Sequence, residues 1–428
     1  MDAISLFSSV GIGDLGLREN EIETIIACEL IKERMDLFQS NFPNAMSYCG
    51  DIWKLYQTIC DEYLSKYDKP PFLLIATPPC QGMSSNGMGK LLSDYRKGLR
   101  PELDPRNRLI IPAIEIIKKL QPQWIILENV ANMINTVILD EQGHLVNIID
   151  YIRTALEPYY IGSPEVIDCA DYGVPQHRKR LITIFSRTEN AKVYFERYKT
   201  FMPIPTHGAT ASLLVEQWKT VRDAISHFPE LSSEKGNNKD TFFHPLHKVP
   251  LLDEKKLFWV RNTPEGATAF NNQCVNPACL YQENPVHGAR RNTEGINRYK
   301  ENTPIYCQEC GELLPRPWVE DPKTGAKRLM KGYVSAYKRM YWDEPASTLT
   351  QNFQYACSDN KLHPSQDRVL SLYEALVLQS VAEYNYSFKI DGKFVRDGLI
   401  RDAIGESVPP KIIDLICKHI KRIEAVAK

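Results

Sequence analysis

The sequence lacks any run of apolar residues long enough to cross a membrane. A spanning helix needs about 20 such residues, and no stretch approaching that length occurs among the 428 residues of the chain. The first residues, MDAISLF, also lack the basic segment that opens a secretory signal. Both absences argue against a membrane protein and a secreted one, and we expect a globular protein of the cytoplasm.

The sequence also lacks a net charge of either sign. Its 52 Lys and Arg side chains balance 53 Asp and Glu side chains, so the formal charge is −1 and gives no overall indication of nucleic-acid binding. Within residues 284–340, however, eleven basic residues stand against six acidic ones. A local basic excess indicates a partner that carries phosphates, although a solvated protein surface has the same composition.

A disulfide framework is missing as well. Seven of the eleven cysteines lie apart in the sequence, mostly in or beside apolar runs: Cys28, Cys49, Cys60, Cys80, Cys169, Cys357 and Cys417. The remaining four form two close pairs, which fits a reducing compartment and one metal site better than oxidised bridges.

What the sequence does contain, in its first half, is an alternation of strand-like and helix-like segments. Apolar, β-rich runs of strand length occupy 3–7, 23–30, 72–77, 124–130 and 180–186. Segments with apolar residues three and four positions apart, such as 32–42 and 106–120, lie between them. This alternation predicts an α/β fold with a doubly wound, mostly parallel sheet, whose ligands bind beyond the carboxyl ends of the strands.

The alternation stops after residue 188. Residues 189–335 are richer in Pro, Asn and Gly, and helical patterns return at 371–381 and 411–426. We therefore expect a catalytic domain formed by residues 1–188 and 336–428, with a loop-rich domain inserted at 189–335.

The most informative motif is LLIATPPCQGMSSNG at 73–87. Pro78 and Pro79 stiffen the backbone after a strand and would hold Cys80 at the edge of the sheet, where its thiolate could act as a nucleophile. A buried structural cysteine after a rigid turn is the alternative. A phosphate-binding loop is excluded because Met88 stands where such a loop requires lysine.

Two further strand ends carry candidate site residues. Glu128 closes the run at 124–130, so its carboxylate is expected near Cys80. In VPQHRKRLITIF, strand alternation places Arg178 and Arg180 on one face, opposite His177 and Lys179. Taken singly, a solvated carboxylate and a basic edge strand explain these residues equally well.

In combination and in this order, the motifs resemble those of the DNA (cytosine-5)-methyltransferase family. ISLFSSVGIGDLGL is similar to its cofactor loop, TPPCQGMS to its nucleophile motif, ENV to its glutamate motif and YGVPQHRKR to its arginine motif. IIACELIKERMDLFQSNFP, GDIW, LDPRNRL, YWDEPASTLTQN, HPSQDR and IGESVPP resemble further motifs of the family. The resemblance covers about 1–190 and 336–428, and leaves the insert as a target-recognition region.

The resemblance implies a mechanism and a site. Cys80 would be the nucleophile that adds to carbon 6 of a cytosine flipped out of double-stranded DNA. Glu128 would bind the ring at nitrogen 3, and Arg178 and Arg180 would hold the carbonyl oxygen of the base and its flanking phosphate.

S-adenosylmethionine is the cofactor that the resemblance implies. The residues carried over to its pocket are Phe7, Ser9, Gly11, Ile12, Glu29, Asp51, Ile52, Pro79, Ser407 and Val408. The glycines of GIGDLG at 11–16 also match a dinucleotide-binding fingerprint, with Glu29 at a suitable distance. Nothing later in the chain supports NAD or FAD, whereas the nucleophile, glutamate and arginine motifs support a methyl donor.

Spacing alone predicts a zinc site in the insert. Cys274 and Cys279 form C-x4-C, and Cys307 and Cys310 form C-x2-C after a gap of 27 residues. Both spacings suit tetrahedral zinc held by four thiolates, a closed and therefore structural site. Reduced cysteines without a metal are the alternative.

Three positions depart from the family's usual pattern. Ser9 replaces the first glycine of the F-x-G-x-G turn, Glu406 replaces a common asparagine, and Tyr373 replaces an arginine. Ser9 and Glu406 fall in the cofactor pocket, where they are candidates for lowering affinity. We expect Ser9 to adopt a negative φ and to lie near the methionine end of the cofactor.

The sequence thus predicts an active double-stranded DNA methyltransferase of prokaryotic or phage type, acting as a monomer. A restriction endonuclease of the same system is a candidate partner. A tRNA cytosine-5 methyltransferase and a catalytically silent DNA-binding regulator of the same fold are the two alternatives. Intact Cys80, Glu128 and Arg178 argue against the second.

Overall fold

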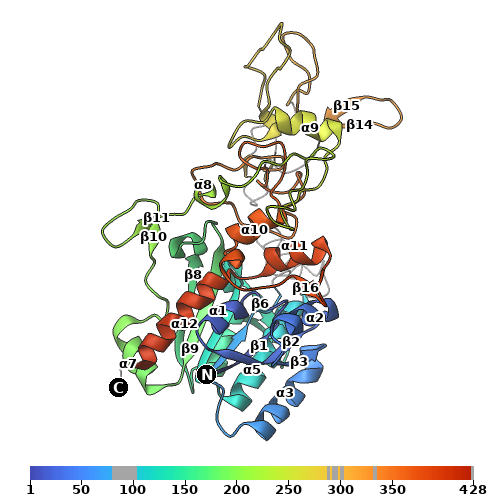
Figure 1. Ribbon diagram of the computed structural model, residues 1–428. Helices are drawn as coiled ribbons and strands as arrows, with labels where there is room; N and C mark the ends of the chain where they lie inside the picture. The colour runs from blue at the N-terminus through green and yellow to red at the C-terminus, as the bar shows by residue number, and fades with distance from the viewer. Residues whose placement is uncertain (80–103, 287–289, 292–296, 299–302, 331–334, 426–428) are drawn as a thin grey trace.

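A seven-stranded sheet forms the centre of the larger part of the molecule (Figure 1). The computed structural model describes residues 1–79, 104–286, 290–291, 297–298, 303–330 and 335–425. The strand order is β3-β2-β1-β4-β5-β9-β8, and only β9 runs antiparallel to its neighbours. The strands are β1 (Asp2–Leu6), β2 (Glu23–Glu29), β3 (Met46–Cys49), β4 (Leu73–Ala76), β5 (Trp124–Val130), β8 (Ile161–Asp168) and β9 (Lys179–Ser186).

Helices cover both faces of this sheet because its strands are apolar on both faces. On one face α3 (Ile52–Lys66), α5 (Ile110–Leu120) and α6 (Ile148–Leu156) bury their isoleucines in a single core with strand residues. On the other face lie α1 (Asp14–Glu19), α7 (Glu189–Tyr198) and α12 (Pro410–Ala425). The doubly wound, mostly parallel sheet predicted from the sequence is confirmed.

A second core joins the beginning of the chain to its last third. Val10, Leu15 and Phe38 of the first strand–helix units pack with residues of α10 (Leu372–Leu378) and α11 (Asp397–Glu406). Helix α2 (Lys32–Asn41) lies in this core, and α8 (Val221–Ile225) contributes Val221 and Ile225. The C-terminal residues therefore complete the wall around the sheet edge.

A smaller, loop-rich part extends away from the sheet at the top of Figure 1. It carries α9 (Glu254–Arg261) and the hairpin β14 (Trp318–Glu320) and β15 (Lys327–Leu329). Its apolar core combines Trp259 and Phe270 with Tyr337, Leu362 and Val369. The division of the chain at residues 188 and 335 stays a prediction, and this core contains residues from both sides of 335.

The remaining regular elements are short. Two-stranded sheets are formed by β6 (Val137–Leu139) with β7 (Leu145–Asn147), by β10 (His207–Gly208) with β11 (Glu216–Gln217), by β12 (Arg290–Arg291) with β13 (Asn297–Arg298), and by β16 (Lys389–Ile390) with β17 (Lys393–Phe394). Within the described residues, no helix is both long and apolar enough to span a membrane.

Candidate active site

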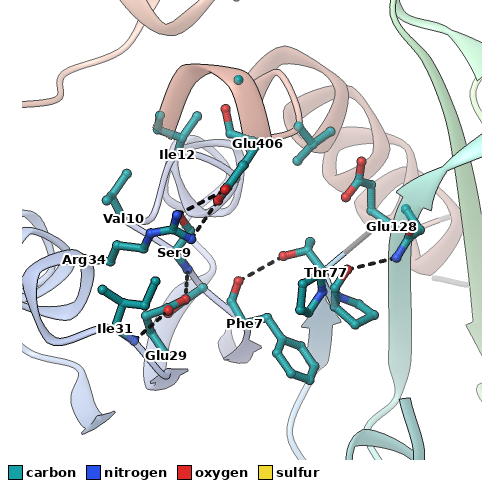
Figure 2. A pocket seen from close by; sticks show the side chains of 18 of the residues that line it. Phe7, Ser9, Val10, Ile12, Glu29, Ile31, Arg34, Thr77, Glu128 and Glu406 are labelled. Carbon is teal, nitrogen blue, oxygen red and sulfur yellow. Dashed lines mark hydrogen bonds and ion pairs between the residues drawn. The ribbon is translucent and has the colours of Figure 1, made fainter. Parts of the chain in front are cut away.

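The carboxyl ends of the central strands surround a cavity of about 650 Å³, which we call the edge cavity (Figure 2). Its wall includes residues that follow β1, β2, β3, β4 and β5, as expected for the ligand site of an open α/β sheet. Segments 348–352 and 405–408 close it from the last third of the chain. Residues more than 300 positions apart in the sequence thus form one site.

The turn after β1 forms one side of the edge cavity. Phe7 and Ser9 both adopt positive φ, at 58° and 49°. Thr77 donates its hydroxyl to the carbonyl of Phe7 at 3.0 Å, and the backbone N–H of Ser9 donates to Glu29 Oε2 at 3.0 Å. The prediction of a negative φ at Ser9 is wrong: serine takes the left-handed conformation that glycine adopts freely, in a turn that these contacts fix.

Gly11 is the one residue assigned to the cofactor that the structure does not place on the cavity wall. Its φ is +85°, and a Cβ at this position would come within 2.5 Å of the Phe42 ring and 2.8 Å of Phe38. The glycine therefore serves the close approach of the turn to α2. The other nine assigned residues line the cavity: Phe7, Ser9, Ile12, Glu29, Asp51, Ile52, Pro79, Ser407 and Val408.

Two acidic residues stand at adjacent strand ends on this wall. Glu29 ends β2, and Asp51 follows β3, which pairs with β2 in parallel register. The Glu29 carboxylate is held in place by the backbone N–H groups of Ser9 and Ile31, the latter at 2.9 Å. Asp51 caps α3 by accepting the N–H of Trp53 at 3.0 Å. Figure 2 shows Glu29 directly below Ser9.

Glu128 and Arg180 form a buried ion pair across two strands. Glu128 pairs directly with Ile182 in the antiparallel register of β5 and β9, so Arg180 is its diagonal neighbour. Arg180 Nε lies 2.9 Å from Glu128 Oε1, and both side chains are at most one-tenth exposed. Burial raises the pKa of the Glu128 carboxyl, and the charges of Arg180 and Arg178 oppose that rise.

Arg178 has contacts of a different kind. Its side chain is fully buried, and its guanidinium donates to the backbone carbonyl of Leu349 at 2.7 Å. It donates as well to the carbonyls of Gly405 and Ser407, each at 2.8 Å. These contacts join the residue before β9 to the two C-terminal segments of the cavity wall. The assignment of Arg178 to the base stays a prediction.

Cys80 lies outside the described residues, so its place in the site stays a prediction. The residues that precede it are described, and Pro78 and Pro79 both line the edge cavity. Asn129 donates its side-chain amide to the carbonyl of Pro78 at 2.9 Å. This hydrogen bond fixes the end of the rigid turn beside β5, next to Glu128.

Sequence reasoning did not single out several residues of the wall. Arg34 of α2 forms an ion pair with Glu406 at 2.6 Å, and Gln351 also donates to Glu406. Asp14 lines the cavity with a buried carboxyl, which accepts from Thr24 at 2.8 Å and Ser5 at 3.1 Å. Nothing in the local pattern indicated Arg34, because its partner is 372 residues away.

The four cysteines of the two close pairs come together in the loop-rich part. All four Sγ atoms lie within 4.8 Å of one another. Cys274 and Cys310 are 3.7 Å apart at sulfur, and Cys279 and Cys307 are 3.9 Å apart. Four thiolates around tetrahedral zinc, each about 2.3 Å from the ion, have sulfurs about 3.8 Å apart. The two measured separations match this value, and the other pairs lie within 4.8 Å.

Comparisons with known proteins point in one direction. The family model described as C-5 cytosine-specific DNA methylase matches residues 1–422. The Type II methyltransferase M1.HgaI of Avibacterium volantium is 30% identical over 433 residues, which cover 97% of each chain. The Type II methyltransferase M.AgeI of Thalassovita gelatinovora is 23% identical over 98% of this chain and 99% of its own. The solved structure of the Entamoeba histolytica methyltransferase EhMeth shares the fold, with a TM-score of 0.53, 13% identity, and coverage of 99% and 98%.

Proposed function

The chain belongs to the C-5 cytosine-specific DNA methylase family, and we propose that it methylates carbon 5 of cytosine in double-stranded DNA through a covalent adduct of Cys80. The family match over residues 1–422 favours DNA over tRNA as the substrate. The observation that carries the proposal is the buried Glu128–Arg180 pair on the wall of the edge cavity, beside the turn that leads to Cys80.

Carbon 5 of cytosine is a weak nucleophile, and the residues of the site would increase its reactivity. The Cys80 thiolate adds to carbon 6, and electron density then moves to carbon 5, which takes the methyl group. Loss of the carbon-5 proton and elimination of the thiolate restore the aromatic ring. Glu128, whose pKa is raised by burial, supplies a proton or hydrogen bond at ring nitrogen 3. Arg180 binds the base carbonyl or its phosphate.

The edge cavity fits S-adenosylmethionine as the methyl donor. Its volume of about 650 Å³ is in the range of small-molecule sites. Glu29 has lone pairs left beyond its two backbone contacts, so its carboxylate would accept the ribose hydroxyls. Asp51 and Ile52 would contact the adenine amino group and ring, and Phe7 its other face. When bound, the cofactor supplies an electrophilic methyl group.

The target cytosine must leave the DNA duplex to reach this cavity. Extruding a stacked base costs a few kcal/mol, which contacts to the flipped base and to the displaced strand must offset. The wall formed by β5 and β9 is the place for the base, because Glu128 and Arg180 present charged groups there.

We propose that the loop-rich part recognises the DNA sequence and that its four cysteines hold zinc. The sulfur–sulfur distances of 3.7 and 3.9 Å support a tetrahedral ion. A closed site of four thiolates is structural and would fix the loops that carry the local basic excess. The names of the relatives, as Type II methyltransferases, also support a place in a restriction–modification system with a cognate endonuclease.

The proposed chemistry has a direct test. A duplex that contains 5-fluorocytosine cannot lose the carbon-5 substituent, so the protein with its methyl donor should form an adduct that survives denaturation. The adduct should be absent in Cys80→Ala and present in the matched control Cys357→Ala, an exposed cysteine outside the site. An adduct on Cys80→Ala, or one on tRNA but not on duplex DNA, would overturn the proposal. Bisulfite sequencing of DNA from expressing cells then gives the target site.

A further inference from the structure

Two arginines stand at the start of β9, Arg178 directly before the strand and Arg180 within it, and they contact different parts of the site. Arg180 pairs with Glu128 at the β5 side of the edge cavity. Arg178, two residues earlier, donates to three backbone carbonyls, those of Leu349, Gly405 and Ser407, at 2.7 to 2.8 Å. All three acceptors belong to residues that line the same cavity.

The three carbonyls belong to two wall segments that touch each other. A Cβ on Gly405 would lie 2.2 Å from the backbone nitrogen of Gln351, so the two segments pack at a distance that only glycine permits. Backbone carbonyls that are buried need donors. Arg178 supplies donors to both segments from a single rigid group, and it thereby fixes them to each other and to β9.

A pair of glutamines extends the same arrangement. Gln176 accepts the N–H of Leu349 at 2.8 Å and donates to Gln379 Oε1 at 2.7 Å. Gln379 in turn donates to the carbonyl of Ser407 at 2.8 Å, which Arg178 also reaches. We call Gln176, Arg178 and Gln379 the polar brace. Its members are fully buried, and hydrogen bonds are stronger in such surroundings of low dielectric constant than in water.

We propose that Arg178 is a positioning residue for the methyl donor. Through the polar brace it fixes the position of wall segment 405–408 relative to the Glu128–Arg180 pair. This inference rests on the proposed function, because it needs a cofactor in the edge cavity. Ser407, Val408 and Arg180 all line that cavity, and the proposed function assigns the first two to the cofactor and Arg180 to the base. The donor and the cytosine are then aligned by one short segment, residues 178–180, whose two arginines contact both sides.

The test compares two matched Arg→Lys substitutions at the start of β9. Binding of S-adenosylhomocysteine is measured by calorimetry in the absence of DNA, where a residue that only contacts the base has no effect. Lysine keeps the charge of Arg178 but cannot serve three separate carbonyls. Arg178→Lys should weaken binding by about tenfold to a hundredfold, the range expected for losing one or two hydrogen bonds to a charged donor. Arg180→Lys should change it by less than about twofold.

Kinetics and a second variant keep the outcome decisive. Arg178→Lys should raise the KM for S-adenosylmethionine, whereas Arg180→Lys should mainly lower kcat. If Arg178→Lys does not fold, Gln379→Met removes a second donor to Ser407 and should weaken S-adenosylhomocysteine binding about threefold to tenfold. If the folded variants bind S-adenosylhomocysteine as tightly as the unaltered protein, the positioning role of the polar brace is wrong, and Arg178 would contact the base instead. Failure of the unaltered protein to bind S-adenosylhomocysteine would instead count against the proposed function.

Discussion

The edge cavity and the four-cysteine cluster are built by different means. Five strand ends contribute to the cavity, and the strands behind them are buried in cores of many apolar residues. Around the cysteines, within the part of the chain that the structure describes, the apolar cluster has Cys274, Cys307 and Leu314 as buried members, with Cys279 and Tyr281 packed against them. The hydrogen bonds of the sheet fix the strand ends and therefore the geometry of the cavity. The cluster lies in short loops outside any sheet, and the zinc proposed above would fix these loops to one another.

This difference predicts whether a substitution changes catalysis or folding in each region. At the strand ends of the cavity, a side chain can be exchanged without loss of the wall, because the sheet sets their position, whereas the wall segments 348–352 and 405–408 are held by side-chain contacts. In the cluster, each thiolate would be a ligand of the proposed zinc, and binding of structural zinc is coupled to folding. Substitutions at the strand ends of the cavity should therefore change catalysis with little effect on folding, whereas substitutions of the four cysteines should change folding and function together.

Removing the metal should give the largest effect. Structural zinc contributes an apparent free energy of about 10 kcal/mol or more, so Cys274→Ser should release the ion and expose residues near 274–316 to proteases. Metal content and limited proteolysis measure this. Binding of S-adenosylhomocysteine should persist, since the cavity lies at the sheet, while binding of duplex DNA should be lost.

Cys357→Ser is the control for that experiment, because Cys357 is exposed and outside the cluster. It should keep the metal and the protease resistance. If Cys274→Ser also kept its protease resistance with no metal bound, the contrast between the two regions would be wrong and the loop packing would suffice.

The second effect is on catalysis and should leave the fold intact. Glu128→Gln keeps the shape of the side chain and an acceptor for Arg180 Nε, but it removes the proton donor at ring nitrogen 3. The methylation rate should fall by about a hundredfold to ten-thousandfold, the usual contribution of a general acid. Methyl transfer from labelled S-adenosylmethionine measures it, with Glu115→Gln as control, since Glu115 forms a partly exposed ion pair with Lys118 away from the cavity wall.

The sequence could predict those parts of the molecule that depend on local pattern. Apolar strands, amphipathic helices and the turn at Pro78–Pro79 are read from neighbouring residues, and the structure confirms the sheet they form. Short β3, whose residues are only half buried, and β8, which contains Gly162 and Pro164, gave no periodic signal.

What could not be predicted depends on contacts between distant segments. The conformation of Ser9 is set by Glu29, twenty residues on, and the carbonyl partners of Arg178 lie 171 to 229 residues away. A motif predicts that an arginine is needed, but the direction of its side chain follows from tertiary packing. The same applies to Gly11, which faces α2 and not the cavity.

The third prediction concerns Asp14, whose burial raises its pKa to about 6. Since the pKa in the unfolded chain is near 3.8, the folded protein holds more protons between about pH 4 and 6, and its stability falls as the pH rises through that range. Asp14→Asn should remove this loss. Relative to the unaltered protein it should gain about 2 kcal/mol between pH 4 and pH 7, measured by urea unfolding.

Asp36→Asn is the matched control, because Asp36 lies exposed on α2 beside Lys32. The difference in free energy of unfolding between Asp36→Asn and the unaltered protein should not rise with pH in the same way. A difference between Asp14→Asn and the unaltered protein that stays constant from pH 4 to pH 7 would show that the buried carboxyl does not limit stability in this part of the cavity wall.

The smallest effect is expected where the cavity wall depends on one ion pair. Arg34 and Glu406 join α2 to the end of α11, and their side chains are 16% and 26% exposed, so solvent screens the pair only in part. Glu406→Asn, which introduces the residue common in the family, should lower the free energy of unfolding by about 1 kcal/mol. Arg34→Met with Glu406→Asn should cost less than the sum of the two single changes, because the pair is then absent altogether. Strict additivity in urea unfolding would show that the two charges do not interact. A loss of several kcal/mol would mean that this edge of the sheet, like the cysteine cluster, relies on single side-chain contacts for its support.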